Sequence, residues 1–194
     1  MTLVERLAQA DEQALAASGL ACLDRCVPLL GGDDEALRPL WAALADSSDW
    51  SQHLDKARGA LTAPGAPDDP GADWDPGSAE AEAATLARGM LDAAPADRTA
   101  DAVRAWADTC SVDALRVHRI LDPATEGTDG LEARGTGGAE GVSPLVAAEL
   151  RRQIAVLDLL AEHGASGLRG ALEASVEGRR ILRAVVSRRA RGRG

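Results

Sequence analysis

The sequence contains no phenylalanine and no tyrosine, and four tryptophans are its only aromatic residues. Alanine is abundant, at 40 of the 194 residues. Alanine, leucine, arginine and glutamate favour helices, whereas the aromatic and β-branched residues that favour strands are absent or few. A chain of this length can bury a real core within one domain. These features predict an all-α single domain whose core combines leucine, valine and tryptophan with closely packed alanine.

Apolar residues recur at steps of three and four along eight segments, a spacing typical of amphipathic helices. Gly19, Pro28 and the glycines at 31 and 32 are expected to separate the first of them. The predicted helices cover approximately residues 3–18, 20–27, 33–46, 48–61, 78–94, 97–121, 143–163 and 166–189. Pro39 lies inside the third, so that helix either starts late or is kinked. The pattern predicts a bundle of seven or eight mostly antiparallel helices.

Two long segments rich in glycine and proline, residues 63–77 and 122–142, are predicted loops. The first contains clustered aspartates, which are suitable oxygen ligands for Mg²⁺ or Ca²⁺. They lack the spacing of a twelve-residue calcium loop and an aromatic-lined cavity, so a solvated acidic loop is the favoured interpretation. Trp74 lies among these acids, and we expect it to fold back onto the helices or to contact a partner.

Charge is distributed unevenly along the chain. The net charge is −10, yet the segment from Gly164 onward carries eight arginines and only two glutamates. An acidic body repels nucleic acid and anionic membranes. We therefore predict a helical domain over residues 1–187 and a disordered Arg/Gly-rich tail over residues 188–194. Any nucleic-acid contact is expected only through the tail arginines, Arg188, Arg189, Arg191 and Arg193.

The sequence points to a cytoplasmic protein. It has no apolar run long enough to span a membrane, and its first residues lack the basic and apolar regions of a secretory signal. Its three cysteines are odd in number and have no framework spacing, which indicates free and mostly buried thiols.

Five residues are candidates for a binding site. Cys22 and Cys26 lie four apart and would share one helix face, where two thiolates could hold a soft metal or form a redox pair. A zinc site would need further ligands from distant parts of the chain, so buried core thiols are the favoured interpretation and no metal is predicted. His53 and His118 can titrate near neutral pH. Trp74 completes the set.

Several segments resemble a known family. These are the Ala-Cys-Leu helix ending in proline at residues 21–28, the Leu-Trp-Ala-Ala-Leu run at 40–44, the helix at 50–56 followed by an acidic loop, and the helix at 143–162. In their order and apolar pattern they resemble the YjaG-like family of uncharacterised all-helical bacterial proteins. The resemblance covers most of the chain and rests on no catalytic motif. It implies an all-helical fold and no particular activity.

No nucleophile–base set and no cofactor fingerprint can be recognised, and the glycine-rich run at 135–141 lacks dinucleotide-binding spacing. No catalytic residue and no cofactor are predicted. We expect a non-enzymatic protein-binding or regulatory module, similar in role to an immunity protein or chaperone. Its expected partner is another protein, one with a basic surface. A homo-oligomer is compatible with the sequence. The alternative is a small-molecule-binding protein or biosynthetic enzyme with a pocket between helices, lined by Trp41, Trp50 and Trp106.

Overall fold

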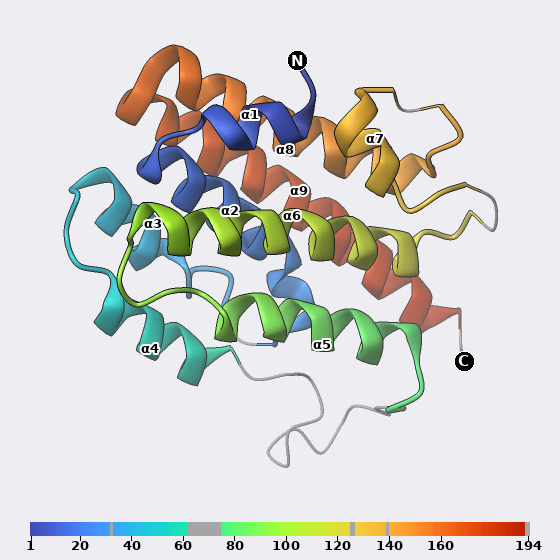
Figure 1. The fold of residues 1–194 in the computed structure, drawn as a ribbon. Helices are drawn as coiled ribbons and strands as arrows, with labels where there is room; N and C mark the ends of the chain where they lie inside the picture. Colours follow the sequence, from blue (N-terminus) through green and yellow to red (C-terminus); the bar gives the residue numbers. More distant parts are fainter. Residues whose placement is uncertain (32, 62–74, 125–126, 139, 193–194) are drawn as a thin grey trace.

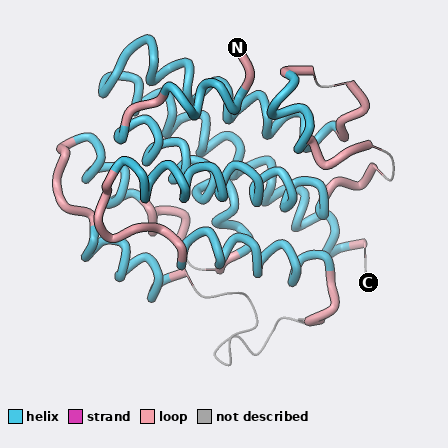
Figure 2. Tube along the Cα trace, in the orientation of Figure 1, coloured by secondary structure: helices cyan, strands magenta, loops and turns pink. Residues whose placement is uncertain are grey.

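A computed structural model describes residues 1–31, 33–61, 75–124, 127–138 and 140–192. Helices account for nearly all of the secondary structure in these residues, which confirms the predicted all-α bundle in one domain (Figures 1 and 2). The α-helices are α1 (Leu3–Gln9), α2 (Glu12–Cys26), α3 (Arg38–Ala45), α4 (Ser51–Ala60), α5 (Ala79–Asp92), α6 (Ala100–Leu121), α7 (Leu131–Thr136), α8 (Pro144–His163) and α9 (Leu168–Arg191).

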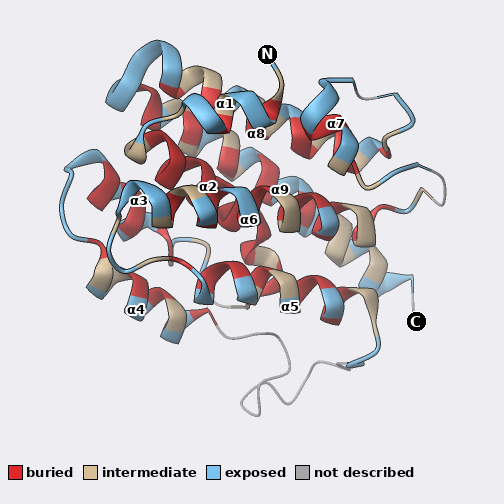
Figure 3. Ribbon diagram, viewed as in Figure 1, coloured by how far each residue is buried: buried red, intermediate tan, exposed pale blue. Residues whose placement is uncertain are grey.

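Helix α2 is the centre of the bundle. Helices α5, α6, α8 and α9 all pack against it, and every residue from Ala14 to Cys26 is buried (Figure 3). A helix buried on all sides needs small residues where its neighbours approach closely, and alanine and glycine meet this need in α2. The surrounding helices turn one apolar face toward it. The prediction of a core built on leucine and alanine is thus confirmed.

Two tryptophans anchor the core next to α2. The rings of Trp50 and Trp106 meet edge to face, with centroids 5.7 Å apart. Their indole N–H groups donate to the carbonyl oxygens of Pro95 and Met90, so neither ring buries an unpaired polar atom. The Trp106 ring lies against the backbone of Gly19. These two rings fill the interior of the bundle beside α2.

The contact with Trp106 explains why the predicted break at Gly19 is wrong. A side chain at residue 19 would come within 2.7 Å of the Trp106 ring, so glycine at this position permits helix packing and does not end the helix. The chain breaks earlier, between α1 and α2. Asp11 caps α2 there, because its carboxylate accepts from the backbone N–H of Ala14 at 2.8 Å.

Other helix boundaries agree more closely with those predicted from the sequence. Helix α3 begins late, at Arg38, with Pro39 in its first turn, and α8 begins at Pro144 directly after Ser143. The predicted loop at 122–142 contains one short helix, α7. Most of the predicted loop at 63–77 lies outside the described residues. The tail predicted from residue 188 is instead helical as far as Arg191, because α9 continues without interruption.

Helices α8 and α9 form an antiparallel hairpin. A four-residue 3₁₀ turn, Gly164–Gly167, joins them. At Gly167 an added side chain would collide with the carbonyl oxygen of Leu159, so only glycine allows the two helices to approach this closely. Among the described residues, none of the helices has both the length and the apolar character that crossing a bilayer would require.

Candidate functional site

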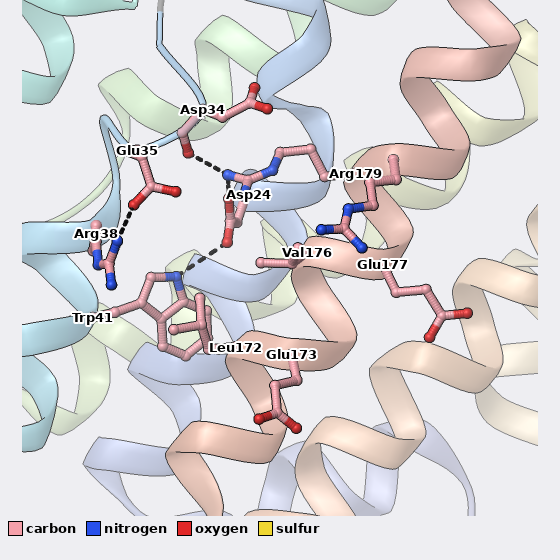
Figure 4. Close-up of a pocket in the computed structure, with 11 residues that line it drawn as sticks. Asp24, Asp34, Glu35, Arg38, Trp41, Leu172, Glu173, Val176, Glu177 and Arg179 are labelled. Atoms are coloured by element: carbon pink, nitrogen blue, oxygen red, sulfur yellow. Dashed lines mark hydrogen bonds and ion pairs between the residues drawn. The ribbon is translucent and has the colours of Figure 1, made fainter.

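A pocket lies between α3 and α9, with the chain segment before α3 along one side (Figure 4). Its volume is about 490 Å³, which is within the range of binding pockets. Three hydrophobic side chains and eight charged ones line it: Asp24, Asp34, Glu35, Arg38, Trp41, Leu172, Glu173, Val176, Glu177, Arg179 and Arg180. Five of these charged groups are carboxylates and three are guanidinium groups, so the pocket has an acidic surplus.

The floor of the pocket is a buried group of three side chains from three helices. The Asp24 carboxylate, on α2, accepts from Arg179 on α9 at 2.8 Å and from the indole N–H of Trp41 on α3 at 3.2 Å. Arg179 also donates to the backbone carbonyl of Asp34. These bonds tie α3 and the segment before it to α9, so the floor is held rigidly.

The rim of the pocket is more exposed and contains ion pairs of little energetic weight. Arg183 forms a two-pronged ion pair with Asp34, and Glu35 pairs with Arg38 within one turn. Glu177 forms no hydrogen bond or ion pair with another described residue. Its charge interacts at longer range with Arg152 of α8, and its exposed carboxylate can be approached by a cationic group at the rim.

A second pocket of about 400 Å³ continues from the first along α3 and α9. The two share Arg38, Trp41 and Leu172, and the second is lined mainly by apolar atoms from Ala42, Ala45, Ala165 and Leu168, with Ser166 and Arg169 at its edge. We call the two pockets together the α3–α9 groove. One half is acidic, the other is apolar, and Trp41 lies between them.

Asp24 gives the groove an unusual titration. Burial raises the pKa of Asp24 from 3.8 to about 6, although Arg179 and Trp41 oppose the shift. Between pH 3.8 and about 6, Asp24 therefore keeps a proton in the folded state, whereas the unfolded state releases that proton. Its contribution to stability is present below pH 3.8 and is lost as the pH rises through about 6.

Asparagine at position 24 removes this titration. We expect the stability of Asp24→Asn relative to the native chain to increase as the pH rises from about 5 to about 8. Denaturant unfolding at both ends of this range measures it. Asp34→Asn is the matched control: its ion pair with Arg183 lowers the pKa of Asp34, so that carboxylate stays ionised throughout and the difference should be constant. If the stability difference between Asp24→Asn and the native chain were also constant over this pH range, it would contradict the raised pKa of Asp24.

A second polar cluster is completely buried between α2, α6 and α8. Arg25 donates two hydrogen bonds to Glu149, at 2.7 and 2.6 Å, and neither side chain is exposed. Burial alone would raise the pKa of Glu149, but Arg25, His118 and Gln153 together outweigh burial and the pKa is lowered. Gln153 donates to Glu149 at 2.9 Å and links it to Ser111. Arg134 of α7 reaches the same hydroxyl at 3.0 Å.

Three of the sequence-predicted site residues lie at this buried cluster. Cys22 accepts from Arg25 at 3.4 Å, and the Nε2 atom of His118 is 3.6 Å from Glu149. Burial raises the pKa of Cys22 to about 12 and that of Cys26 well above its usual value, so both thiols remain protonated. Burial lowers the pKa of His118, whose Nδ1 donates to the Ala114 carbonyl. The cluster is closed to solvent and acts as internal structure.

The other predicted candidates are not near it. His53 is half-buried on α4, away from both the groove and the cluster. Trp74 lies outside the described residues. No group of three or more histidine, cysteine or acidic side chains in the described ranges is arranged to hold a metal ion.

Sequence reasoning missed the residues that form the groove. Asp24 and Arg25 are the only charged residues between Ala14 and Cys26, a stretch that is otherwise apolar or small. A buried charge requires a partner, so this pair indicates that two residues of opposite charge lie next to it in the fold. Its partners, Arg179 and Glu149, are more than 120 residues away along the chain, and no local pattern identifies them.

No protein-family model, curated protein or solved structure matches this chain. The resemblance to the YjaG-like family therefore stays a prediction.

Proposed function

We propose that this chain is a non-enzymatic protein-binding or regulatory module, and that the α3–α9 groove binds a basic amphipathic segment of another protein. The observation that carries the proposal is the continuity of the groove across Trp41, with carboxylates on one side and apolar side chains on the other. An amphipathic helix with apolar residues on one face and cationic residues on the other is complementary to such a surface. The net charge of −10 would also attract a basic partner at long range.

The two halves of the groove contribute differently to recognition. Ala42 and Ala45 are exposed, and the partly buried Leu172 separates them from the acidic half, so apolar side chains of a partner would bury surface here. At the other end Glu35, Glu173 and Glu177 are exposed, and they would steer arginine or lysine side chains toward the floor. Affinity would thus come mainly from the apolar half and charge selectivity from the acidic half.

A synthetic helical peptide with leucine on one face and arginine on the other tests the proposal by fluorescence anisotropy. We expect saturable binding that salt weakens, and no binding of the same peptide with glutamate in place of arginine. The triple variant Glu35→Gln, Glu173→Gln, Glu177→Gln should bind about ten-fold more weakly. Ala42→Asp should abolish binding through the apolar half.

The matched control neutralises three exposed glutamates away from the groove, Glu82→Gln, Glu132→Gln and Glu162→Gln. It changes the net charge equally and should leave the affinity close to the native value. Equal weakening by both triple variants would mean that only net charge matters, and it would contradict a defined groove.

The pocket volume favours one alternative, a small organic cation as the ligand. A volume of about 490 Å³ with a carboxylate at its floor suits such a molecule. Arginine amide distinguishes the two: binding as tight as that of the peptide would favour a small-molecule role, and weak or absent binding would favour the protein segment.

A further inference from the structure

The outer face of α9 carries a stripe of exposed side chains whose charge is segregated along the helix. It runs through Glu173, Glu177, Ile181, Ala184, Arg188 and Arg191, all exposed. The last five are spaced by four, three, four and three residues, the spacing of a seam between two packed helices. The N-terminal end of the stripe is acidic, the C-terminal end is basic, and Ile181 and Ala184 form its middle, with the exposed Arg180 beside them. We call it the α9 stripe.

Among the described residues, most of these charges form no ion pair, although Glu177 interacts at longer range with Arg152 of α8. Glu177, Arg188 and Arg191 form no hydrogen bond or ion pair with any other described side chain, and Glu173 has only an exposed contact with Arg169 one turn away. Ile181 is one of three large hydrophobic side chains that the described residues leave exposed. Helix α9 runs to the C-terminal end of the described chain (Figure 1).

When two copies of such a stripe run in opposite directions, the acidic end of each lies against the basic end of the other. If two copies of α9 pack antiparallel about a two-fold axis between residues 182 and 183, Ile181 of one copy faces Ala184 of the other. Glu177 then faces Arg188, and Glu173 lies beside Arg191, offset from it by one residue along the helix. Each contact occurs twice, as two-fold symmetry requires. A parallel arrangement would instead place like charges together at both ends.

We infer that this chain forms a two-fold symmetric homodimer through the α9 stripe. The paired segment is about 28 Å long. One helix pair gives an interface at the small end of the observed range, so we expect a reversible dimer with a dissociation constant on the order of 10 µM. Glu173 and Glu177 also belong to the rim of the α3–α9 groove, so a basic partner would compete with the second copy for them. The inference stands without the groove binding any other protein.

Charge reversal tests the inference by sedimentation equilibrium over a range of concentrations. One variant carries Glu173→Arg and Glu177→Arg, and another carries Arg188→Glu and Arg191→Glu. In each, the stripe bears a single sign of charge, so we expect self-association at least ten-fold weaker than in the native chain. An equimolar mixture of the two should form a heterodimer, and combining all four substitutions in one chain should restore the homodimer.

All four positions are exposed, so folding should be preserved, and circular dichroism checks this. The control Glu132→Arg with Glu140→Arg changes the charge as the first variant does, at two exposed positions outside α9, and should dimerise normally. A native chain that remains monomeric at all concentrations in low salt overturns the inference. Dimerisation of both charge-reversed variants, or a mixture without heterodimer, also overturns it. The peptide test of the α3–α9 groove gives a separate result when the chain is diluted well below the dissociation constant of the dimer, where no second copy competes.

Discussion

Replacing Glu149 by glutamine is expected to lower the free energy of unfolding by about 3–5 kcal/mol. Glu149 is the only carboxylate that contacts Arg25 in the described residues, and both side chains are completely buried. Removing its charge leaves the Arg25 guanidinium in the core without compensation, because Gln153 and His118 supply no negative charge. Equilibrium denaturation by urea measures the loss.

A double variant separates the cost of an unpaired charge from the value of the pair. Arg25→Met with Glu149→Leu fills similar space without charge, and we expect it to recover most of the loss. One Nη atom of Arg25 has no hydrogen-bond partner among the described residues, so the pair does not fully offset its own desolvation. A double variant as unstable as Glu149→Gln would show instead that the pair itself stabilises the fold.

Replacing Gly19 by alanine is the second substitution with a large expected effect. The added methyl group would lie 2.7 and 2.8 Å from two carbons of the Trp106 ring. Trp106 is itself held by its bond to Met90 and by the edge-to-face contact with Trp50, so it cannot move away freely. We expect a net loss of about 1–3 kcal/mol in the free energy of unfolding.

Gly59 provides the matched control. It also lies inside a helix, α4, but an added side chain there meets no atom within 4 Å. Gly59→Ala should therefore raise stability by about 0.5–1 kcal/mol, through helix propensity alone. Thermal and denaturant unfolding of both variants gives the comparison. A stabilising Gly19→Ala would mean that the contact with Trp106 is looser than the structure has it.

The fold could be predicted from the sequence because its main signals are local. Ser143 with Pro144 marks the start of α8, and apolar spacing marks the length of α6. Gly19 misled the prediction for a physical reason. Glycine breaks helices and also permits close packing, and the choice between these roles depends on Trp106, 87 residues away along the chain. No local pattern in the sequence predicts that contact.

The candidate site depended on still longer separations. Asp24 meets Arg179 only because α2 and α9 pack together, and Trp41 completes the floor from a third helix. The sequence pointed to cysteines and histidines because those residue types often carry chemistry. In the fold Cys22, Cys26 and His118 are enclosed by the core. The groove is formed from common residues, and their grouping appears only after folding.

The indole N–H resonances of the tryptophans provide the most direct test of the central claim, that the α3–α9 groove binds a basic amphipathic segment. Trp41 lines both pockets of the groove, whereas Trp50 and Trp106 line neither of them. On titration of the isotope-labelled chain with the leucine–arginine peptide, we expect the Trp41 indole signal to shift saturably. The Trp50 and Trp106 signals should stay in place, and Trp41→Phe identifies the first signal by its loss. Saturable binding of the peptide with an unmoved Trp41 signal would contradict the assignment of the groove.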